Sequence, residues 1–287
     1  MHPGTIAIVL VAAVAHAIWN TVSKYKRGDT LVFVWAYTCA AALLCVPVGI
    51  IPVITGIQTL SWSLVVGSVV SAVLHVVYSL TLQTGYDRSD LGVVYPVARG
   101  TGPVLTMLFA IMVLGEQLTP IVIIGAVAVV VGIVVVAGNP FRGGQRRPLQ
   151  GVSWGVITGA AIAGYTLWDN HSVTTLHLEP VTYFTGTFLL QGLMLTPRAL
   201  RRRDQIPTVV RTNAAPILII AVFSPLAYIL VLTAMQTAPV ALVAPLRESS
   251  IVVGSLLAWW LFGEGHLARR IIGAVVVLAG IAAISLG

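Results

Sequence analysis

Two prolines, two glycines and an arginine fall within one short stretch, Val93-Val94-Tyr95-Pro96-Val97-Ala98-Arg99-Gly100-Thr101-Gly102-Pro103. The apolar run 104–114 follows directly, which predicts that the stretch lies at membrane depth rather than in a surface loop. An interrupted helix is tolerated at that depth only where its freed backbone groups face protein or a watery cavity. We therefore expect a broken helix here, with Pro96 and Pro103 as hinges.

A second stretch of the same kind comes later in the chain, as Val243-Ala244-Pro245-Leu246-Arg247-Glu248-Ser249-Ser250. It also carries a proline and an arginine within a long apolar run, and Pro245 is its expected hinge. Two interrupted helices at matching places in two halves are a sequence sign of the substrate site of a secondary transporter.

The composition is that of a polytopic membrane protein. Of the 287 residues, 57% are hydrophobic and only 9% are charged, whereas an ordinary soluble domain carries about 25% charged residues. The net charge of +7 does not indicate nucleic acid as a partner, because most basic residues lie in short gaps between apolar runs. Cys39 and Cys45 share one apolar segment and no histidines have metal-ligand spacing, so we expect no disulfide, metal or cofactor.

The apolar runs predict an all-α membrane protein with ten transmembrane helices, since a span needs about 20 mostly apolar residues. The expected spans are 4–23, 31–54, 61–84, 91–114, 120–138, 151–172, 180–197, 214–236, 239–262 and 269–286. Apart from Arg99 and Arg247, every lysine and arginine falls in loops, or at span edges, on one side of this arrangement. The positive-inside rule places that side in the cytoplasm and both chain termini outside.

An internal repeat covers nearly the whole chain. Gly115-Glu116 recurs as Gly263-Glu264, and the motif at 123–127 recurs at 271–275, in both cases 148 residues later. Because each half has an odd number of spans, the second half begins on the opposite side of the membrane, and the halves are inverted repeats. We expect a first five-helix repeat at 1–138, a cytoplasmic linker at 139–150 and a second five-helix repeat at 151–287.

Two five-span halves, each with a Gly-Glu turn before a glycine-bearing final helix, resemble the EamA domains of the drug/metabolite transporter superfamily. The opening His16-Ala17-Ile18-Trp19-Asn20 is also similar to the first helix of many such proteins. The resemblance covers the whole chain. It implies a ten-helix basket around a central cavity, in the inner membrane, that moves small metabolites by alternating access. Several relatives export amino acids, so it further implies an exporter of aromatic and other neutral amino acids.

Arg99 and Arg247 are the charged residues expected at the central site. Each lies about 13 Å inside its span at 1.5 Å per residue, and charge at that depth is costly, so both should face the interior. One interpretation is that one or both bind a substrate carboxylate, which a guanidinium can hold with two hydrogen bonds. The other is a structural pair with Glu248 as counter-ion. Because neighbours along a helix do not face each other, Glu248 is a better partner for Arg99 than for Arg247.

Rings and polar groups on other spans complete the candidate substrate site. Amphipathic rings offer a partly apolar cargo both a stacking surface and a hydrogen-bonding edge. His75 and Tyr78 lie three residues apart and therefore on one helix face. The other candidates are Trp19, Asn20, Tyr95, Tyr165, Trp168 and Tyr228. Tryptophans collect at membrane interfaces whatever the function, which is the second interpretation of Trp19 and Trp168.

Fewer residues bear on the coupling of transport to protons and on the packing of the helices. Asp169, Glu248 and His75 are the possible proton carriers. Asp169 is expected near the outer end of its span, in contact with water, so the sequence favours facilitated exchange over proton antiport. Glu116 should cap the helix that follows it. Glycines at seven-residue spacing should let helices approach closely, as scaffold or as a dimer contact, so that monomer and homodimer both stay open. These glycines are Gly125, Gly132, Gly273 and Gly280.

Other functions fit the sequence less well. An enzyme is disfavoured because no nucleophile–base pattern, pair of catalytic carboxylates or metal motif is present. A channel is compatible with broken helices, but the sequence shows no filter-like loop and no ring of like charges. The main alternative among carriers is efflux of cationic drugs. That activity would need an acid exposed in the cavity, and Glu248 could serve if it were free of Arg99.

The orientation can be tested by thiol labelling. A cysteine introduced at Gln236 should react with an impermeant thiol reagent from outside, and one introduced at Gln145 should stay out of reach. The reverse pattern would contradict the assignment of both termini to the outside.

Overall fold

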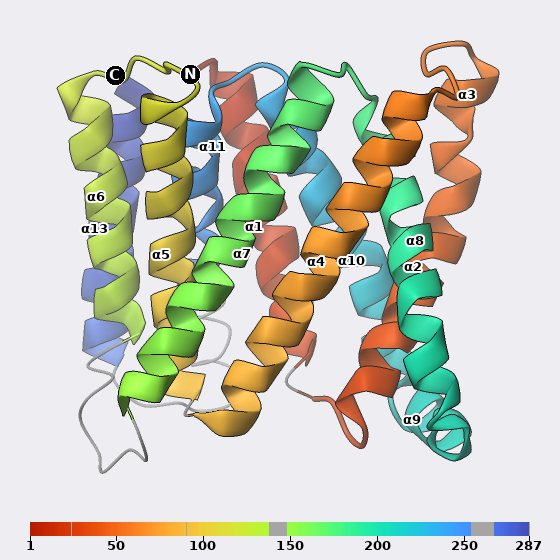
Figure 1. Ribbon diagram of the computed structural model, residues 1–287. Coiled ribbons are helices and arrows are strands. Elements are labelled where there is room, and N and C mark those ends of the chain that lie inside the picture. The colour runs from red at the N-terminus through yellow and green to blue at the C-terminus, as the bar shows by residue number, and fades with distance from the viewer. Residues whose placement is uncertain (24, 90, 138–147, 254–266, 287) are drawn as a thin grey trace.

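The computed structural model describes residues 1–23, 25–89, 91–137, 148–253 and 267–286 (Figure 1). This part of the chain is built of helices, and it contains no strand. The longer helices are α1 (Pro3–Ser23), α2 (Thr30–Gly49), α4 (Trp62–Arg88), α5 (Leu91–Met112), α6 (Pro120–Ala137), α7 (Pro148–Thr174), α8 (Pro180–Leu200), α10 (Ala214–Met235) and α13 (Leu267–Leu286). The shorter ones are α3 (Ile51–Ile54), η1 (Arg203–Gln205), α9 (Ile206–Thr212) and α11 (Val240–Arg247).

Four helical segments are long and apolar enough to cross a membrane, judged by length and composition over the described residues. They are Pro3–Ser23, Thr30–Ile54, Trp62–Leu82 and Ala214–Met235. Shorter apolar segments run at Val97–Met112, Pro120–Gly132 and Ile271–Ile284. Many of their large apolar side chains are exposed in the isolated chain, as expected for helices whose outer faces contact lipid.

The helix packing is symmetric under exchange of the two halves of the chain. The exchange pairs α1 with α7, α2 with α8, α4 with α10, α5 with α11 and α6 with α13. Helix α1 packs on α10 as α7 packs on α4, α5 packs on α7 as α11 packs on α1, and α2 packs on α10 as α8 packs on α4. The remaining large contacts, α2 with α8, α6 with α13 and α5 with α11, join a helix to its own counterpart.

Counterpart helices run antiparallel, so the halves are inverted. Trp35 Nε1 near the start of α2 donates to Thr196 Oγ1 near the end of α8 at 2.9 Å. At the other end of the same pair, Thr182 Oγ1 donates to the Gly49 carbonyl oxygen at 2.7 Å. Figure 1 shows both termini at the same end of the molecule.

Glycines allow the final helices of the halves to touch. A Cβ added at Gly125 of α6 would lie 2.7 Å from the Gly280 carbonyl oxygen of α13, and one added at Gly132 would lie 2.9 Å from that of Gly273. Real Cβ atoms do not approach backbone oxygens so closely, so α6 and α13 need glycine to pack at this distance. The glycines at seven-residue spacing therefore join the two halves within one chain.

The prediction of a broken helix at 93–103 was wrong. Helix α5 is continuous from Leu91 to Met112. Gly102 serves close packing instead, since a Cβ there would lie 2.8 Å from Ile162 Cγ2 of α7. Pro103 is buried within the unbroken helix. The side chains of Tyr95 and Pro96 lie outside the described residues.

The second interruption was predicted correctly. Helix α11 ends at Arg247, Glu248 and Ser249 form a turn, and helix resumes at Ser250. Two backbone bonds mark the turn, from Glu248 N to the Pro245 oxygen at 3.1 Å and from Ser249 N to the Leu246 oxygen at 3.1 Å. This i to i−3 spacing tightens the last turn of a helix. The break therefore begins at Glu248, three positions after Pro245 and directly after Arg247.

Candidate functional site

A buried carboxylate lies between the two intramembrane arginines. Glu248 has no exposed side-chain surface. Arg99 Nη1 donates to its Oε1 at 3.3 Å and to its Oε2 at 3.2 Å, and Arg247 Nη2 donates to Oε1 at 3.4 Å. Arg99 and Arg247 are themselves buried, at 4% and 3% exposure. One acid thus joins a cation of the first half to a cation of the second.

Glu248 contacts Arg99, as the sequence predicts, but it also contacts its neighbour Arg247, which the sequence argument made the less favoured partner. That argument holds within a regular helix. Here α11 ends at Arg247 and Glu248 lies in the turn that follows. The two side chains meet in this turn, although the residues are consecutive in the sequence.

Arg99 has a further partner on the first helix. Its Nη2 contacts Nε2 of His16 on α1. An arginine only donates and stays charged, so His16 accepts this hydrogen bond as a neutral ring protonated on Nδ1. Arg99 is therefore held by both oxygens of Glu248 and by a ring nitrogen.

Arg247 is held less completely. Besides Glu248, its Nη2 is 3.5 Å from the Tyr165 hydroxyl of α7, and its guanidinium carbon is 5.9 Å from the ring centroid of Tyr228 on α10. Its Nε is buried and has no hydrogen-bond partner. An unsatisfied buried donor costs about 1–3 kcal/mol, and native structures hold few of them. Arg247 thus retains unused capacity to donate hydrogen bonds.

A second buried carboxylate, that of Asp169 on α7, anchors three other helices. It accepts hydrogen bonds from the Tyr183 hydroxyl of α8 at 2.6 Å and the Tyr228 hydroxyl of α10 at 2.6 Å. Nε2 of His75 on α4 is 3.0 Å away. The expectation of an Asp169 in contact with water was wrong, because the residue has no exposed surface. Helix α7 runs on to Thr174, and α8 and α10 cover this turn with their tyrosines.

Aromatic rings fill the space between the two acids. His75 stacks on Tyr165 with 4.2 Å between centroids and an interplanar angle of 25°. Tyr228 meets His75 edge-to-face at 5.3 Å and lies 4.6 Å from Phe184 of α8. Tyr78 contacts Tyr165 edge-to-face at 5.4 Å. We call the rings of His75, Tyr78, Tyr165, Phe184 and Tyr228 the aromatic cluster. It borders Arg247 on one side and Asp169 on the other.

The formal charges of the buried residues in this region sum to zero, with histidine counted as neutral. Among residues whose burial the structure describes, the charged ones that are buried are Arg99, Arg247, Asp169 and Glu248. Both acids are occupied, Asp169 by three neighbouring groups and Glu248 by two arginines. A substrate that brings net charge would therefore unbalance the interior, where uncompensated charge is costly.

Three predicted site residues lie apart from the aromatic cluster. Trp19 contacts His16 edge-to-face at 4.9 Å and packs against the apolar cluster of α2, α9 and α10. The amide nitrogen of Asn20 donates within α1, to the His16 oxygen at 3.0 Å. Trp168 Nε1 donates to the Gly67 oxygen at 3.0 Å. Trp168 also lines a pocket, which lies at the end of the molecule that holds both termini.

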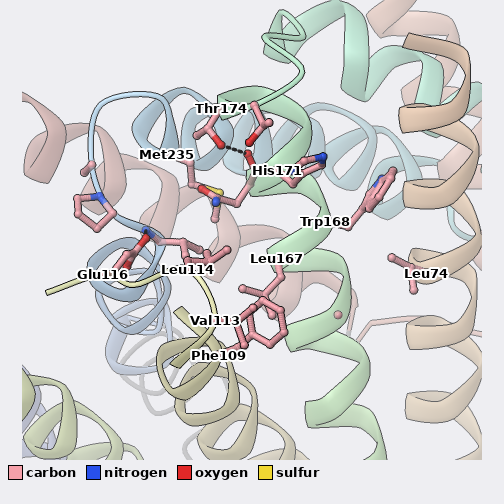
Figure 2. A pocket seen from close by; sticks show the side chains of 16 residues that line it. Leu74, Phe109, Val113, Leu114, Glu116, Leu167, Trp168, His171, Thr174 and Met235 are labelled. Carbon is pink, nitrogen blue, oxygen red and sulfur yellow. Dashed lines mark hydrogen bonds between the residues drawn. The ribbon is translucent and has the colours of Figure 1, made fainter. Parts of the chain in front are cut away.

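That pocket has a volume of about 740 Å³ and opens between α5, α7 and the α10–α11 turn. Figure 2 shows its walls, to which Phe109 and Val113 contribute from the α5 side and Leu167 and His171 from α7. Lining residues Leu74, Gly164 and Trp168 directly precede, in the sequence, His75, Tyr165 and Asp169. The pocket and the aromatic cluster therefore share the same turns of α4 and α7.

Glu116, at the rim of this pocket, caps a different helix from the one expected. Its carboxylate accepts from the backbone nitrogens of Val240 and Ala241, both at 3.2 Å. The prediction that it caps α6 was wrong: the inverted fold brings the α11 N-terminus against the turn after α5. The favourable interaction of an acid with a helix N-terminus is kept, but it links the two halves.

Tyr183 and Phe184 were missed as site residues. They lie in a mostly apolar helix, in which nothing in the sequence marks Tyr183 as a partner of Asp169. The one available signal was the pair itself, two adjacent rings three and four residues after Pro180. His16 was noted only as part of a motif, and its contact with Arg99 depends on packing between distant helices.

A family model described as the EamA-like transporter family matches residues 3–138 and 149–286. The chain therefore belongs to the EamA-like transporter family. A solved structure described only as "Crystal structure of protein" is 16% identical to this chain, with a TM-score of 0.79, and the alignment covers 100% of this chain and 98% of that one. No curated protein matches the sequence at a significant level.

The three-partner acid gives a stability prediction. Asp169→Ala should lower the unfolding temperature of the purified protein by several degrees, because two buried hydroxyls lose their acceptor at about 1–3 kcal/mol each. Asp204→Ala is the matched control, since Asp204 is exposed. Thermal unfolding followed by size-exclusion chromatography measures both. Equal unfolding temperatures for the two variants would contradict an anchoring role.

Proposed function

We propose that the protein exports aromatic and other neutral amino acids, and related small metabolites, across the inner membrane by alternating access. The observation that carries the proposal is the buried site, in which charged groups of both signs sum to zero beside a cluster of rings. A neutral amino acid carries one charge of each sign and an apolar body. Its entry leaves the interior charge unchanged and offers the rings a surface to pack on.

The orientation belongs to the same proposal, with ten spans and both termini outside. Apart from the intramembrane pair, the lysines and arginines with described side chains lie at the end of the bundle opposite the termini. They are Lys26, Arg27, Arg88, Arg198, Arg201, Arg202, Arg203 and Arg211. The opposite end, which holds the pocket, carries Glu116 and Glu179 among its described residues. This separation supports a cytoplasmic position for the basic end.

Alternating access is supported by the inverted halves. Because counterpart helices have equivalent packing in opposite directions, one arrangement can be exchanged for its symmetry-related partner. The present structure differs between the halves at the corresponding stretches, since α5 is continuous and α11 is interrupted after Arg247. We propose that Pro96, Pro103 and Pro245 are the positions at which this difference is exchanged.

The main alternative, efflux of cationic drugs, has less support. A cation would need a buried acid with spare capacity. Glu248 is not free of Arg99, which contacts both of its oxygens, and Asp169 already has three partners. A zwitterion brings its own negative charge, so it does not need a free protein carboxylate.

Counterflow tests the function. Proteoliposomes preloaded with unlabelled phenylalanine should accumulate labelled phenylalanine saturably, and a threonine experiment tests whether the site requires a ring. Vesicles preloaded with tetraethylammonium should not accumulate the labelled cation. Tetraethylammonium counterflow without amino-acid counterflow would select cation efflux. No counterflow of either amino acid, with folded protein in the vesicles, would contradict amino-acid export.

A further inference from the structure

We infer that Arg247, rather than Arg99, receives the carboxylate of the substrate. The inference rests on the proposed function and names the residue that recognises the substrate. The two arginines are related by the repeat and equally buried, so the sequence gives them the same role. The hydrogen bonds of Arg99 and Arg247, however, indicate different roles.

Arg99 is committed to the protein. It reaches both oxygens of Glu248, and its other terminal nitrogen contacts His16. Two of its described partners lie on helices of different halves, α1 and the α11 turn. Arg99 therefore positions Glu248, and a substrate carboxylate would have to displace these contacts to reach it.

Arg247 has donors to spare. Its contacts with Glu248 and with the Tyr165 hydroxyl, at 3.4 and 3.5 Å, are long for charge-assisted and hydroxyl hydrogen bonds, and Nε is buried without a partner. A carboxylate can accept from Nε and a terminal nitrogen of one guanidinium at once. Glu248 contacts Arg247 through a single oxygen and leaves Nε of the guanidinium unused.

The surroundings of Arg247 specify the rest of the ligand. The ring of Tyr228 lies under the guanidinium, and the hydroxyl of Tyr165 lies beside it. Those rings contact His75 and Phe184. The class of ligand that fits is a carboxylate joined to an aromatic or large apolar body, with an ammonium group that keeps the buried charge balanced.

The position of Arg247 also connects it to the pocket. Helix α11 starts at Val240, which lines the pocket, and Arg247 is its last residue. Seven residues at 1.5 Å per residue place Arg247 about 10 Å deeper along the same helix. Tyr165, which contacts Arg247, directly follows the pocket-lining Gly164. A ligand in the pocket thus lies one helix length from the arginine.

The test compares three ligands on purified full-length protein, with binding measured by calorimetry. Phenylalanine carries both charges, phenethylamine lacks the carboxylate, and 3-phenylpropanoate lacks the amine. Arg247→Gln should weaken the binding of phenylalanine and 3-phenylpropanoate at least tenfold and change the binding of phenethylamine less than threefold. Arg247→Lys should give an intermediate loss, because lysine keeps the charge but loses the planar fork. Arg211→Gln, at an exposed site, is the control and should change nothing.

Arg99→Gln separates the two arginines. It should affect the three ligands to a similar extent, through loss of Glu248 positioning. Selective loss of the carboxylate ligands in Arg99→Gln, or equal loss of all three in Arg247→Gln, overturns the inference. If Arg247→Gln does not fold, Arg247→Lys decides by the same comparison.

The outcomes also separate this inference from the proposed function. Phenylalanine bound equally well by wild type and both Arg247 variants overturns the arginine assignment and leaves amino-acid export standing. Failure of wild type to bind phenylalanine, with Arg247-dependent binding of 3-phenylpropanoate, overturns amino-acid export and supports the carboxylate site.

Discussion

The contact of one buried carboxylate with two arginines is the constraint on which the rest of the site depends. Charge at the centre of a membrane protein must be paired, and Glu248 lies next to Arg247 in sequence and against Arg99 in space. Glu248 lies in the turn that directly follows the end of α11 at Arg247. The helix interruption and the ion pairs therefore fall at the same place, and this place ties the fourth predicted span to the ninth.

A second acid organises the neighbouring helices in the same way. Asp169 holds the hydroxyls of Tyr183 and Tyr228 and the ring nitrogen of His75, so α4, α8 and α10 are fixed against α7. With two arginines and two acids, the described interior is neutral, and both acids are used. The unused polar capacity lies on the cation Arg247. That asymmetry favours a ligand that supplies a carboxylate over one that demands it.

The two halves contribute unequally to this site although they are related by the repeat. Arg99 and Arg247 occupy matching positions, but Glu248 has no acidic counterpart beside Arg99, where Gly100 follows. The counterpart of the α11 interruption is a continuous α5. Gly102 of α5 packs closely against α7, as Gly125 and Gly132 of α6 pack against α13.

Much of this architecture could be predicted from the sequence. Apolar runs, the offset of 148 residues and the lone intramembrane charges indicate the helices, the repeat and the Arg99–Glu248 contact. The sequence could not show that Asp169 is buried, because its cover comes from tyrosines on α8 and α10, far along the chain. Nor could it show that α5 is continuous, because glycines and prolines are found both in helices that pack closely and in helices that are interrupted. The helix capped by Glu116 was likewise decided by the way the inverted halves meet.

A charge-balanced interior should carry a zwitterion across the membrane without moving net charge. Labelled phenylalanine uptake into proteoliposomes, with the membrane potential set by potassium gradients and valinomycin, tests it most directly. Initial uptake and final accumulation should be the same at zero, positive and negative potential. Uptake that rises or falls with the imposed potential would show that net charge crosses with the substrate and would contradict electroneutral transport of a zwitterion.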